Sequence, residues 1–480
     1  MRYADYMALL PLMVLSAACA VVMLQIALWR RHGLTAGLTL AGLAATLAAL
    51  TAAAPWTPIQ VTALLTIDRY GLFFIALILL ATGATVLLGY AYFRSWGGHR
   101  EEFYLLLLIA ALGACVLAVS RHFAAFFIGL EILSIALYAL IAYPRKRAVS
   151  VEAGLKYLVL AAGSAGFLLF GMALIYAERG TLDFSALSAG ALLVSGPEQS
   201  LVLLAGLALV MVGVGFKLAL VPFHMWTADV YQGAPAPVTA FVATVSKSAV
   251  VALLVRLLVP AALDQASVFG QALGALAAAS MIGGNFLALR QQSVKRILAY
   301  SSIAHLGYVL VAVLAAGPAF IPAVMFYMTA YTISQLGCFG VIAVRSTQET
   351  EADSLDAFRG LFFQHPWLAA VFTAMLLSLA GIPLTAGFVG KFYVITAGAQ
   401  SHLWWLVLTL VLTSGIGLFY YLRIVVTLFN PAPAAQAAAP TAANPVAFSG
   451  AVVLTVTTLL LVWMGSVPEP LVRLLQQMTP

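Results

Sequence analysis

Three lysines of this sequence stand inside long apolar runs, where a permanent charge is costly. Lys217, Lys247 and Lys391 each lie well within such a run. An ammonium group at the centre of a bilayer costs roughly 2.5–3.5 kcal/mol on insertion scales. Burial can remove the proton of a lysine, whereas an arginine stays charged. We therefore expect these lysines to take up and release protons, and we expect no arginine in the interior.

A glutamate and two histidines add titratable groups to the apolar runs. Glu131 lies close to mid-depth in the run HFAAFFIGLEILSIALYAL. A buried carboxylate needs a cationic partner or a proton, and Lys217 is the natural partner, although the sequence leaves their contact open. His224 and His305 also lie in the interior, where histidine relays protons readily. A single buried histidine is, however, more often a hydrogen-bonded core residue.

Two further lysines, Lys156 and Lys295, lie where apolar runs begin, which places them at entrances to the interior. A competing interpretation is that the central lysines extend to an interface or pair permanently with carboxylates. Glu131 is the only clearly central acid, so permanent pairing cannot satisfy all three central lysines. A proton relay is the interpretation that we favour.

Prolines near two of the lysines predict interrupted helices. Lys217 precedes Pro222 in GFKLALVPFHMW, and Lys391 follows Pro383 in GIPLTAGFVGKF. Proline removes a backbone hydrogen bond, and interrupted membrane helices mark ion sites in transporters. A simple kink is the alternative. The polar segment DVYQGAPAPVTAF is expected to end a half-helix and to bring Asp229 near the entrance of the path.

Composition places these residues in a membrane. Of 480 residues, 64% are hydrophobic and 8% are charged, far below the roughly 25% charged residues of soluble proteins. The net charge of +7 comes without a basic cluster interleaved with aromatics, so nucleic-acid binding is not expected. The three cysteines stand apart, and neither a CxxC pair nor a glycine-rich fingerprint is present. We therefore expect no metal, iron–sulfur, flavin or nicotinamide site in this chain.

The apolar runs are long and continuous, which indicates an all-α membrane protein rather than a barrel of short alternating strands. About fourteen runs have the length of a membrane span. They are Tyr6–Leu28, Leu34–Ala53, Gly71–Phe93, Phe103–Val119, Ala124–Ala142, Leu155–Tyr176, Leu201–Val221, Pro237–Val259, Val268–Leu289, Ile297–Ala316, Ile321–Val344, Trp367–Ala397, Leu403–Phe429 and Val446–Trp463.

Basic residues are distributed unequally between the two sets of loops. The side that holds both termini carries Arg2, Arg69, Arg121, Arg179, Arg256 and Arg473. The opposite side carries Arg30, Arg31, Arg94, Arg100, Arg145, Lys146, Arg147, Arg290, Arg296, Arg345, Arg359 and Arg423. Since cytoplasmic loops are the more basic ones, we expect the termini to be extracytoplasmic. The acidic stretch 346–356 is expected to be a solvated connector, and the Pro/Ala-rich segment 430–445 a flexible linker.

Three motifs resemble a known family. They are KLALVPFHMWTADVYQGAPAPVTAFVATVSKSA, VKRILAYSSIAHLGY and GIPLTAGFVGKFY, and they are similar to those of the subunit N family of NADH-quinone oxidoreductase, respiratory complex I. The resemblance covers the whole chain, with Ala228 standing where that family is expected to have proline. It implies a single membrane domain, 1–480, with an antiporter-like fold of two inverted five-helix repeats, 103–259 and 266–429. Each repeat would contain one broken helix.

The resemblance also implies roles for the residues above. Glu131 and Lys217 would form a switching charge pair, Lys247 and His305 would be central relay groups, and Lys391 would be the terminal lysine. Accessory positions in the path would be Lys156, His224 and Lys295, with Asp229 at its entrance.

The implied function is proton translocation in a bacterial inner membrane, driven by quinone reduction in other subunits. The expected partners are neighbouring antiporter-like and small membrane subunits, together with the lipid bilayer. Quinone, FMN and iron–sulfur clusters would belong to partner subunits, and no cofactor to this chain. The sister subunits M and L and the Mrp-type cation/proton antiporters share the fold, and an Mrp-type subunit is the alternative. The wording DVYQGAP favours subunit N, as does an end close after the last span.

Overall fold

The computed structural model describes residues 2–94, 98–187, 200–259, 265, 267–315, 320–346, 351–431 and 446–478, which are almost entirely helical. The first half contains α1 (Tyr3–Leu28), α2 (His32–Ala53), η1 (Ala54–Trp56), the antiparallel strands β1 (Ile59–Val61) and β2 (Leu65–Ile67), α3 (Arg69–Phe93), α4 (Glu102–Val119), α5 (Phe123–Ile141), α6 (Ala148–Arg179), η2 (Phe184–Leu187), α7 (Leu201–Leu218), α8 (Thr227–Gly233), α9 (Ala236–Phe241), η3 (Val242–Ser246) and α10 (Lys247–Leu258). The second half contains α11 (Val268–Leu289), α12 (Val294–Ala315), α13 (Phe320–Arg345), η4 (Leu355–Phe358), α14 (Leu361–Gln364), α15 (Pro366–Ala380), α16 (Ala386–Gln400), α17 (Trp404–Phe429), α19 (Phe448–Ser466) and α20 (Glu469–Gln476).

Within these ranges, 13 helices are long and apolar enough to cross a membrane, and α15 is a shorter apolar helix. Together α15 and α16 occupy the predicted run Trp367–Ala397, and every other predicted run coincides with one of the 13 helices. The expected all-α membrane fold is therefore confirmed, with the remaining span made of two half-helices. The predicted linker 430–445 lies, from residue 432 onward, outside the described residues.

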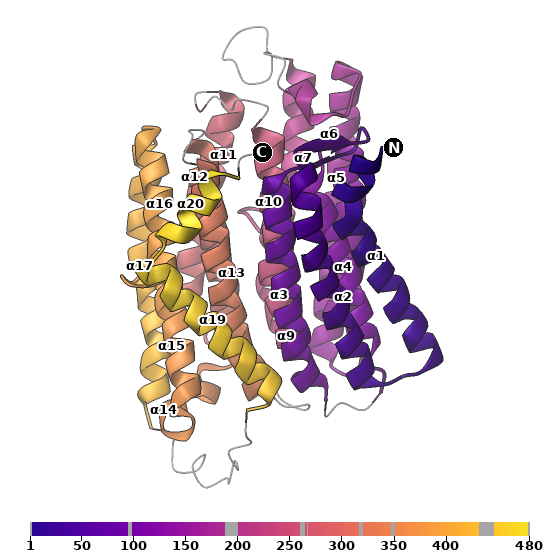
Figure 1. Ribbon diagram of the computed structural model, residues 1–480. Helices are drawn as coiled ribbons and strands as arrows, with labels where there is room; N and C mark the ends of the chain where they lie inside the picture. The colour runs from indigo at the N-terminus through magenta and orange to yellow at the C-terminus, as the bar shows by residue number, and fades with distance from the viewer. Residues whose placement is uncertain are drawn as a thin grey trace.

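The helices of the two halves form two neighbouring groups (Figure 1). Helix α13 packs against α3 and α9 of the first group, and α19 runs obliquely over α13, α16 and α3. Every residue of the continuous span Ala236–Leu258, formed by α9, η3 and α10, is buried. The start of α1 and the end of α20 lie at the same end of the bundle (Figure 1).

One arginine corrects the expectation that the interior contains none. Arg256, which the sequence placed in a loop, lies in α10 and is 7% exposed. Its guanidinium forms a bidentate ion pair with Asp68, in which Nη1 lies 2.9 Å from Oδ2 and Nη2 lies 2.5 Å from Oδ1. Asp68 also accepts the backbone N–H of Gly71 at 2.7 Å and so caps the start of α3. The arginine is buried because a carboxylate at a helix N-terminus compensates its charge.

Candidate functional site: lysines at two helix breaks

The first break separates α7 from α8. Helix α7 ends at Leu218, and Ala219 adopts a left-handed conformation with φ 61°. An interrupted helix leaves carbonyl groups without their usual partners. The ammonium of Lys247 reaches across from α10 and donates to the carbonyl oxygen of Lys217 at 2.7 Å. A lysine at the C-terminal end of a half-helix also has favourable electrostatics with the helix dipole.

Aromatic side chains and neutral acceptors surround the two lysines at this break. The ammonium of Lys217 donates to the hydroxyl of Tyr157 on α6 at 2.9 Å and lies 4.9 Å from the centre of that ring. The ammonium of Lys247 lies 4.8 Å from the centre of the Trp226 ring. Trp226 donates its indole N–H to the carbonyl of Phe216 at 2.9 Å, so it too satisfies the end of α7. Ring faces stabilise cations here, but no ring can accept the proton.

Glu131 lies on α5, half-buried, close to this group but not in contact with it. Among the described residues, no ion pair joins Glu131 to a basic side chain. The rings of Tyr138 and Tyr157 are 5.6 Å apart, and Tyr157 is the residue that Lys217 contacts. Glu131 and Lys217, which were expected to form a charge pair, are therefore not in direct contact in this structure.

The second break separates α15 from α16 and repeats the arrangement of the first. Gly381 follows α15 in a left-handed conformation with φ 86°. The ammonium of Lys391 donates to the carbonyl of Ala380 at 2.8 Å and to the hydroxyl of Ser414 on α17 at 2.7 Å. It lies 5.3 Å from the centre of the Tyr308 ring. A cavity of about 240 Å³ beside Lys391 is lined largely by apolar residues. At both breaks, a lysine ammonium thus binds the carbonyl that the interruption leaves free.

Gly381 provides a test of this geometry. A Cβ atom there would lie 2.9 Å from Cδ of Lys391, at a φ that other residues rarely adopt. We expect Gly381→Ala to displace the Lys391 side chain and to lower the rate of proton translocation severalfold. Backbone strain at residue 381 and the contact of the new Cβ atom with Lys391 both oppose the present position of that side chain. The matched control is Gly415→Ala beside the same cavity, where an added Cβ meets no atom within 4 Å. If both variants translocate protons at the same rate in membrane vesicles, the position of the Lys391 side chain does not matter for activity and the prediction is wrong.

His305 lies between the two breaks in a group of tyrosines. Its ring nitrogens share hydrogen bonds with Tyr327 at 2.7 Å and Tyr421 at 3.1 Å. Next to it, the hydroxyl of Ser302 bonds Tyr331 at 2.6 Å and Tyr231 at 3.3 Å. A small space of about 10 Å³ adjoins His305 and Tyr331, which is roughly the volume that one water occupies. Hydroxyl groups both donate and accept, so they suit proton transfer between titratable groups.

The accessory residues Lys156, Asp229 and His224 differ in their exposure and in their partners. Lys156, which is exposed, contacts Asp229 at 2.8 Å, and Asp229 also contacts Arg296 at 2.8 Å. Asp229 thus links Lys156 on α6 to Arg296 on α12. His224 is half-buried within the first break, and its Nδ1 has no hydrogen-bond partner among the described residues. The structure does not bring His224 into contact with the lysines.

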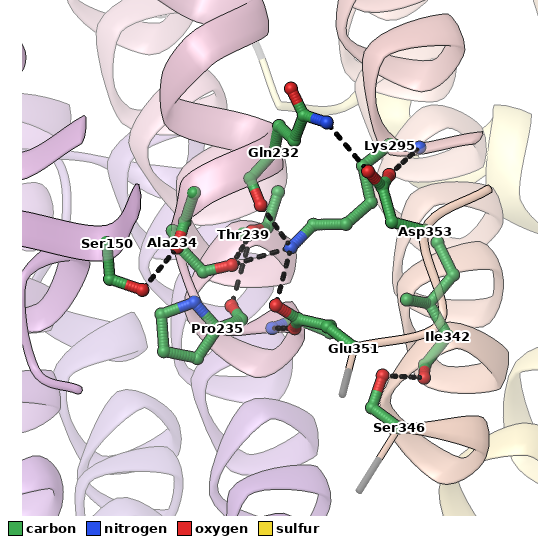
Figure 2. Close-up of polar contacts among 12 residues, drawn as sticks. Ser150, Gln232, Ala234, Pro235, Thr239, Lys295, Ile342, Ser346, Glu351 and Asp353 are labelled. Carbon is green, nitrogen blue, oxygen red and sulfur yellow. Dashed lines mark hydrogen bonds and ion pairs between the residues drawn. The ribbon is translucent and has the colours of Figure 1, made fainter. Parts of the chain in front are cut away.

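Lys295, which the sequence placed where an apolar run begins, lies in the first turn of α12 and is fully buried by other parts of the protein. Its ammonium donates to the carbonyls of Gln232 at 3.0 Å and Ala234 at 2.6 Å and forms an ion pair with Glu351 at 3.1 Å (Figure 2). The carbonyls belong to the end of α8 and the turn that follows it, so Lys295 is a third lysine that binds a helix end in the interior.

The fold and these motifs have counterparts in known proteins. A family model described as NADH:quinone oxidoreductase/Mrp antiporter, TM, matches residues 120–417. The NADH-quinone oxidoreductase subunit N of Methylococcus capsulatus strain Bath is 49% identical over 472 residues, which cover 97% of this chain and 93% of the relative. The chain belongs to the NADH:quinone oxidoreductase/Mrp antiporter family.

Solved structures of this family and related complexes share the fold. A chain of respiratory complex I from Thermus thermophilus with bound aureothin matches with a TM-score of 0.81 and 32% identity, covering 98% of this chain and all of that one. A chain of the Mrp complex from Dietzia sp. DQ12-45-1b matches with a TM-score of 0.85 and 21% identity, covering 99% and 97%. At that identity the second likeness shows the fold alone. The antiporter-like fold is therefore confirmed.

Sequence reasoning missed the neutral partners of the lysines in this family member. Tyr157, Trp226 and Ser414 contact the ammonium groups, and nothing in their local sequence identifies them as partners of a lysine. Residues 347–350 of the acidic stretch 346–356 lie outside the described residues, and the expectation of a solvated connector is wrong for two of its acids. Glu351 and Asp353 instead bind buried groups, because the helix ends that they contact have unpaired N–H groups and cations to offer.

Proposed function

We propose that this chain is the subunit N of NADH-quinone oxidoreductase and translocates protons through its buried titratable groups. The carrying observation is that Lys217, Lys247 and Lys391 are buried against neutral acceptors. Their ammonium groups donate to hydroxyl and carbonyl oxygens, and none is within ion-pair distance of a carboxylate among the described residues. A lysine held permanently as a cation would need an anion at this depth. A lysine that loses and regains its proton needs only acceptors.

The contacts suggest the order of events. Lys247 donates to the carbonyl of Lys217, and Lys217 contacts Tyr157. The ring of Tyr157 lies 5.6 Å from that of Tyr138, which is on the same helix as Glu131. Like charges disfavour one another, so a proton gained at Lys217 makes a proton at Lys247 easier to lose. His305 and its tyrosines would carry that proton toward Lys391 at the second break. In this proposal Glu131 sets the charge on Lys217, and Lys391 is the final donor.

The family of the chain supports a proposal for the setting of this relay. We propose that redox chemistry occurs in partner subunits, which would hold the quinone, FMN and iron–sulfur clusters, and that neighbouring antiporter-like and small subunits contact this chain. The chain would lie in a bacterial inner membrane with extracytoplasmic termini, because the opposite loops are the more basic. The repeats 103–259 and 266–429 would be inverted copies, which the two lysine-bound breaks support.

Replacing Lys217 or Glu131 by alanine tests the function. We expect proton pumping and coupled quinone reduction to fall together by about tenfold, since the switch that loads Lys247 would be missing. Both rates are measured in inverted membrane vesicles energised with NADH. The exposed loop residue Lys146 provides the control variant Lys146→Ala, which should match the parent. Full pumping by both site variants would contradict the proposal.

An Mrp-type antiporter subunit is the second candidate, because it shares both the family model and the fold. The 49% identity to a subunit N over almost the whole chain favours the first. Purification of the chain from native membranes separates the two. A large complex with NADH dehydrogenase activity supports subunit N, and a complex with cation/proton exchange alone supports the antiporter.

A further inference from the structure

Gln335 on α13 is a buried side chain whose amide lacks partners. It is fully buried, and neither Nε2 nor Oε1 has a hydrogen-bond partner among the described residues. Of the side chains with an unpartnered buried atom in these ranges, Gln335 alone has two such atoms. A primary amide offers two N–H groups and two lone pairs, and buried polar groups are nearly always hydrogen-bonded to protein or to water. The amide of Gln335 therefore indicates a small polar ligand beside it.

One neighbour of Gln335 belongs to the contact between the two halves of the chain. Helix α13 packs against α9 and against η3, a π-helical turn that directly precedes Lys247. Such turns are frequent at functional sites. The hydroxyl of Thr332 on α13 lies 3.3 Å from that of Ser248 on α10. Thr332 precedes Gln335 by three residues, so the two side chains share one face of α13, and this face reaches the residue next to Lys247.

A second neighbour of Gln335 belongs to the group around His305. Tyr331 precedes Gln335 by four residues and so lies on the same face of α13. Its hydroxyl bonds that of Ser302 on α12 at 2.6 Å. Ser302 lies about one turn before His305 on that helix. Gln335 is therefore placed between the His305 group in the second half and the hydroxyl contact that leads to the first half.

Water is the ligand that fits this amide. A buried water makes about three hydrogen bonds to polar groups that otherwise have too few partners. The Gln335 amide and the hydroxyls of Tyr331 and Thr332 provide that number of polar groups. Both hydroxyls donate as well as accept, as water does, so a water among them can connect one to the next.

We propose that Gln335 is a positioning residue that holds water where the two halves of the chain meet, and that this water passes protons between the groups beside Lys247 and those beside His305. The inference rests on the proposed function and adds to it the connection between the halves. In each transfer the water accepts one proton from a neighbour and donates another to the next, so it is unchanged afterwards. The amide stays neutral throughout, because it donates and accepts hydrogen bonds without titrating.

Replacing Gln335 by methionine removes the hydrogen-bonding groups and keeps a similar volume. We expect NADH-driven pumping in membrane vesicles, normalised to assembled complex, to fall about tenfold, because proton transfer between the halves loses its water. The yield of complex should not fall, since an apolar group of the same shape in place of a buried polar group is nearly neutral for stability. Gln335→Asn keeps the amide and leaves room for further water, so it should retain most of the parent rate.

The matched control is Thr329→Val on the same helix. The hydroxyl of Thr329 donates to the carbonyl of Met325 in its own helix at 2.9 Å, so this variant should pump at the parent rate. A merely structural role of Gln335 predicts the reverse pattern in Gln335→Met, namely a lower yield of complex and a parent rate for each assembled complex. That pattern, or parent values of both quantities, would overturn the proposal.

Electron cryo-microscopy of the intact complex tests the water directly. We expect density for a water about 2.7–3.2 Å from Nε2 or Oε1 of Gln335 in the parent complex. The same place should hold no water in Gln335→Met. A parent map that resolves waters elsewhere in this chain and shows none beside the amide would contradict the proposal.

The same vesicles separate this inference from the proposed function. If Lys217→Ala pumps fully, the proton relay itself is wrong, whatever the Gln335 variants do. If Lys217→Ala fails to pump and Gln335→Met pumps at the parent rate, only the role of Gln335 is wrong.

Discussion

Replacing Lys247 by methionine should lower NADH-driven proton translocation by more than about tenfold, because the relay loses its central titratable group. Methionine fills similar volume beside Trp226 but cannot carry a proton. The ammonium of Lys247 is fully buried and donates to the carbonyl of Lys217. The rate of pumping in inverted vesicles is the measurement, and Lys146→Met at an exposed loop position is the control.

A second substitution separates titration from structure at the same position. Lys247→Arg keeps a cation that can donate to the carbonyl of Lys217, but the guanidinium does not release its proton. If proton release is what Lys247 contributes, the arginine variant should pump as poorly as the methionine variant while assembling normally. Full pumping by Lys247→Arg would show that Lys247 serves only to satisfy the end of α7.

Replacing Arg256 by leucine should destabilise the protein by about 3–5 kcal/mol, since Asp68 would remain buried without its counter-ion. The arginine also donates to the carbonyl of Ala118 at 2.6 Å and lies 5.0 Å from the centre of the Tyr70 ring. Unfolding of the detergent-solubilised protein in denaturant measures the loss. The double variant Asp68→Asn with Arg256→Leu should lose less than Arg256→Leu alone, because no orphaned charge remains.

An exposed pair offers the matched control for this stability change. Arg473 and Glu469 approach to 2.5 Å, as Arg256 and Asp68 do, but both side chains are more than two-thirds exposed. Exposed pairs contribute about 0–1 kcal/mol. Arg473→Leu should therefore leave stability almost unchanged. A similar loss in both variants would mean that burial of the Arg256 pair is not what makes it important.

The sequence predicted the parts of this structure that depend on local chemistry. Apolar runs of membrane length became the helices, and Pro222 and Pro383 marked both interruptions, because proline and glycine act within their own segments. The burial of Lys217, Lys247 and Lys391 followed from their positions in those runs. These predictions needed no knowledge of which helices are neighbours.

The partners of the lysines could not be predicted, because they come from helices distant in sequence. Tyr157 is 60 residues from Lys217, and Glu351 is 115 residues from Ala236. Arg256 was counted with the loop charges although the predicted run Pro237–Val259 contained it, because its buried partner Asp68 lies 188 residues away and the sequence does not show that they meet. Such pairings are set by tertiary packing, which a single sequence does not contain.

Both ends of the span formed by α9, η3 and α10 are held by side chains that also bind α3 or cap it. At its start, the N–H of Ala236 binds Glu351, which also binds Tyr92 on α3. At its other end, Arg256 binds Asp68, which caps α3. A helical span that is held at both ends and buried along its length has little freedom to slide or tilt. Lys247 therefore lies on a span whose position is fixed. We expect any conformational change during proton transfer to occur in the half-helices α7, α8, α15 and α16.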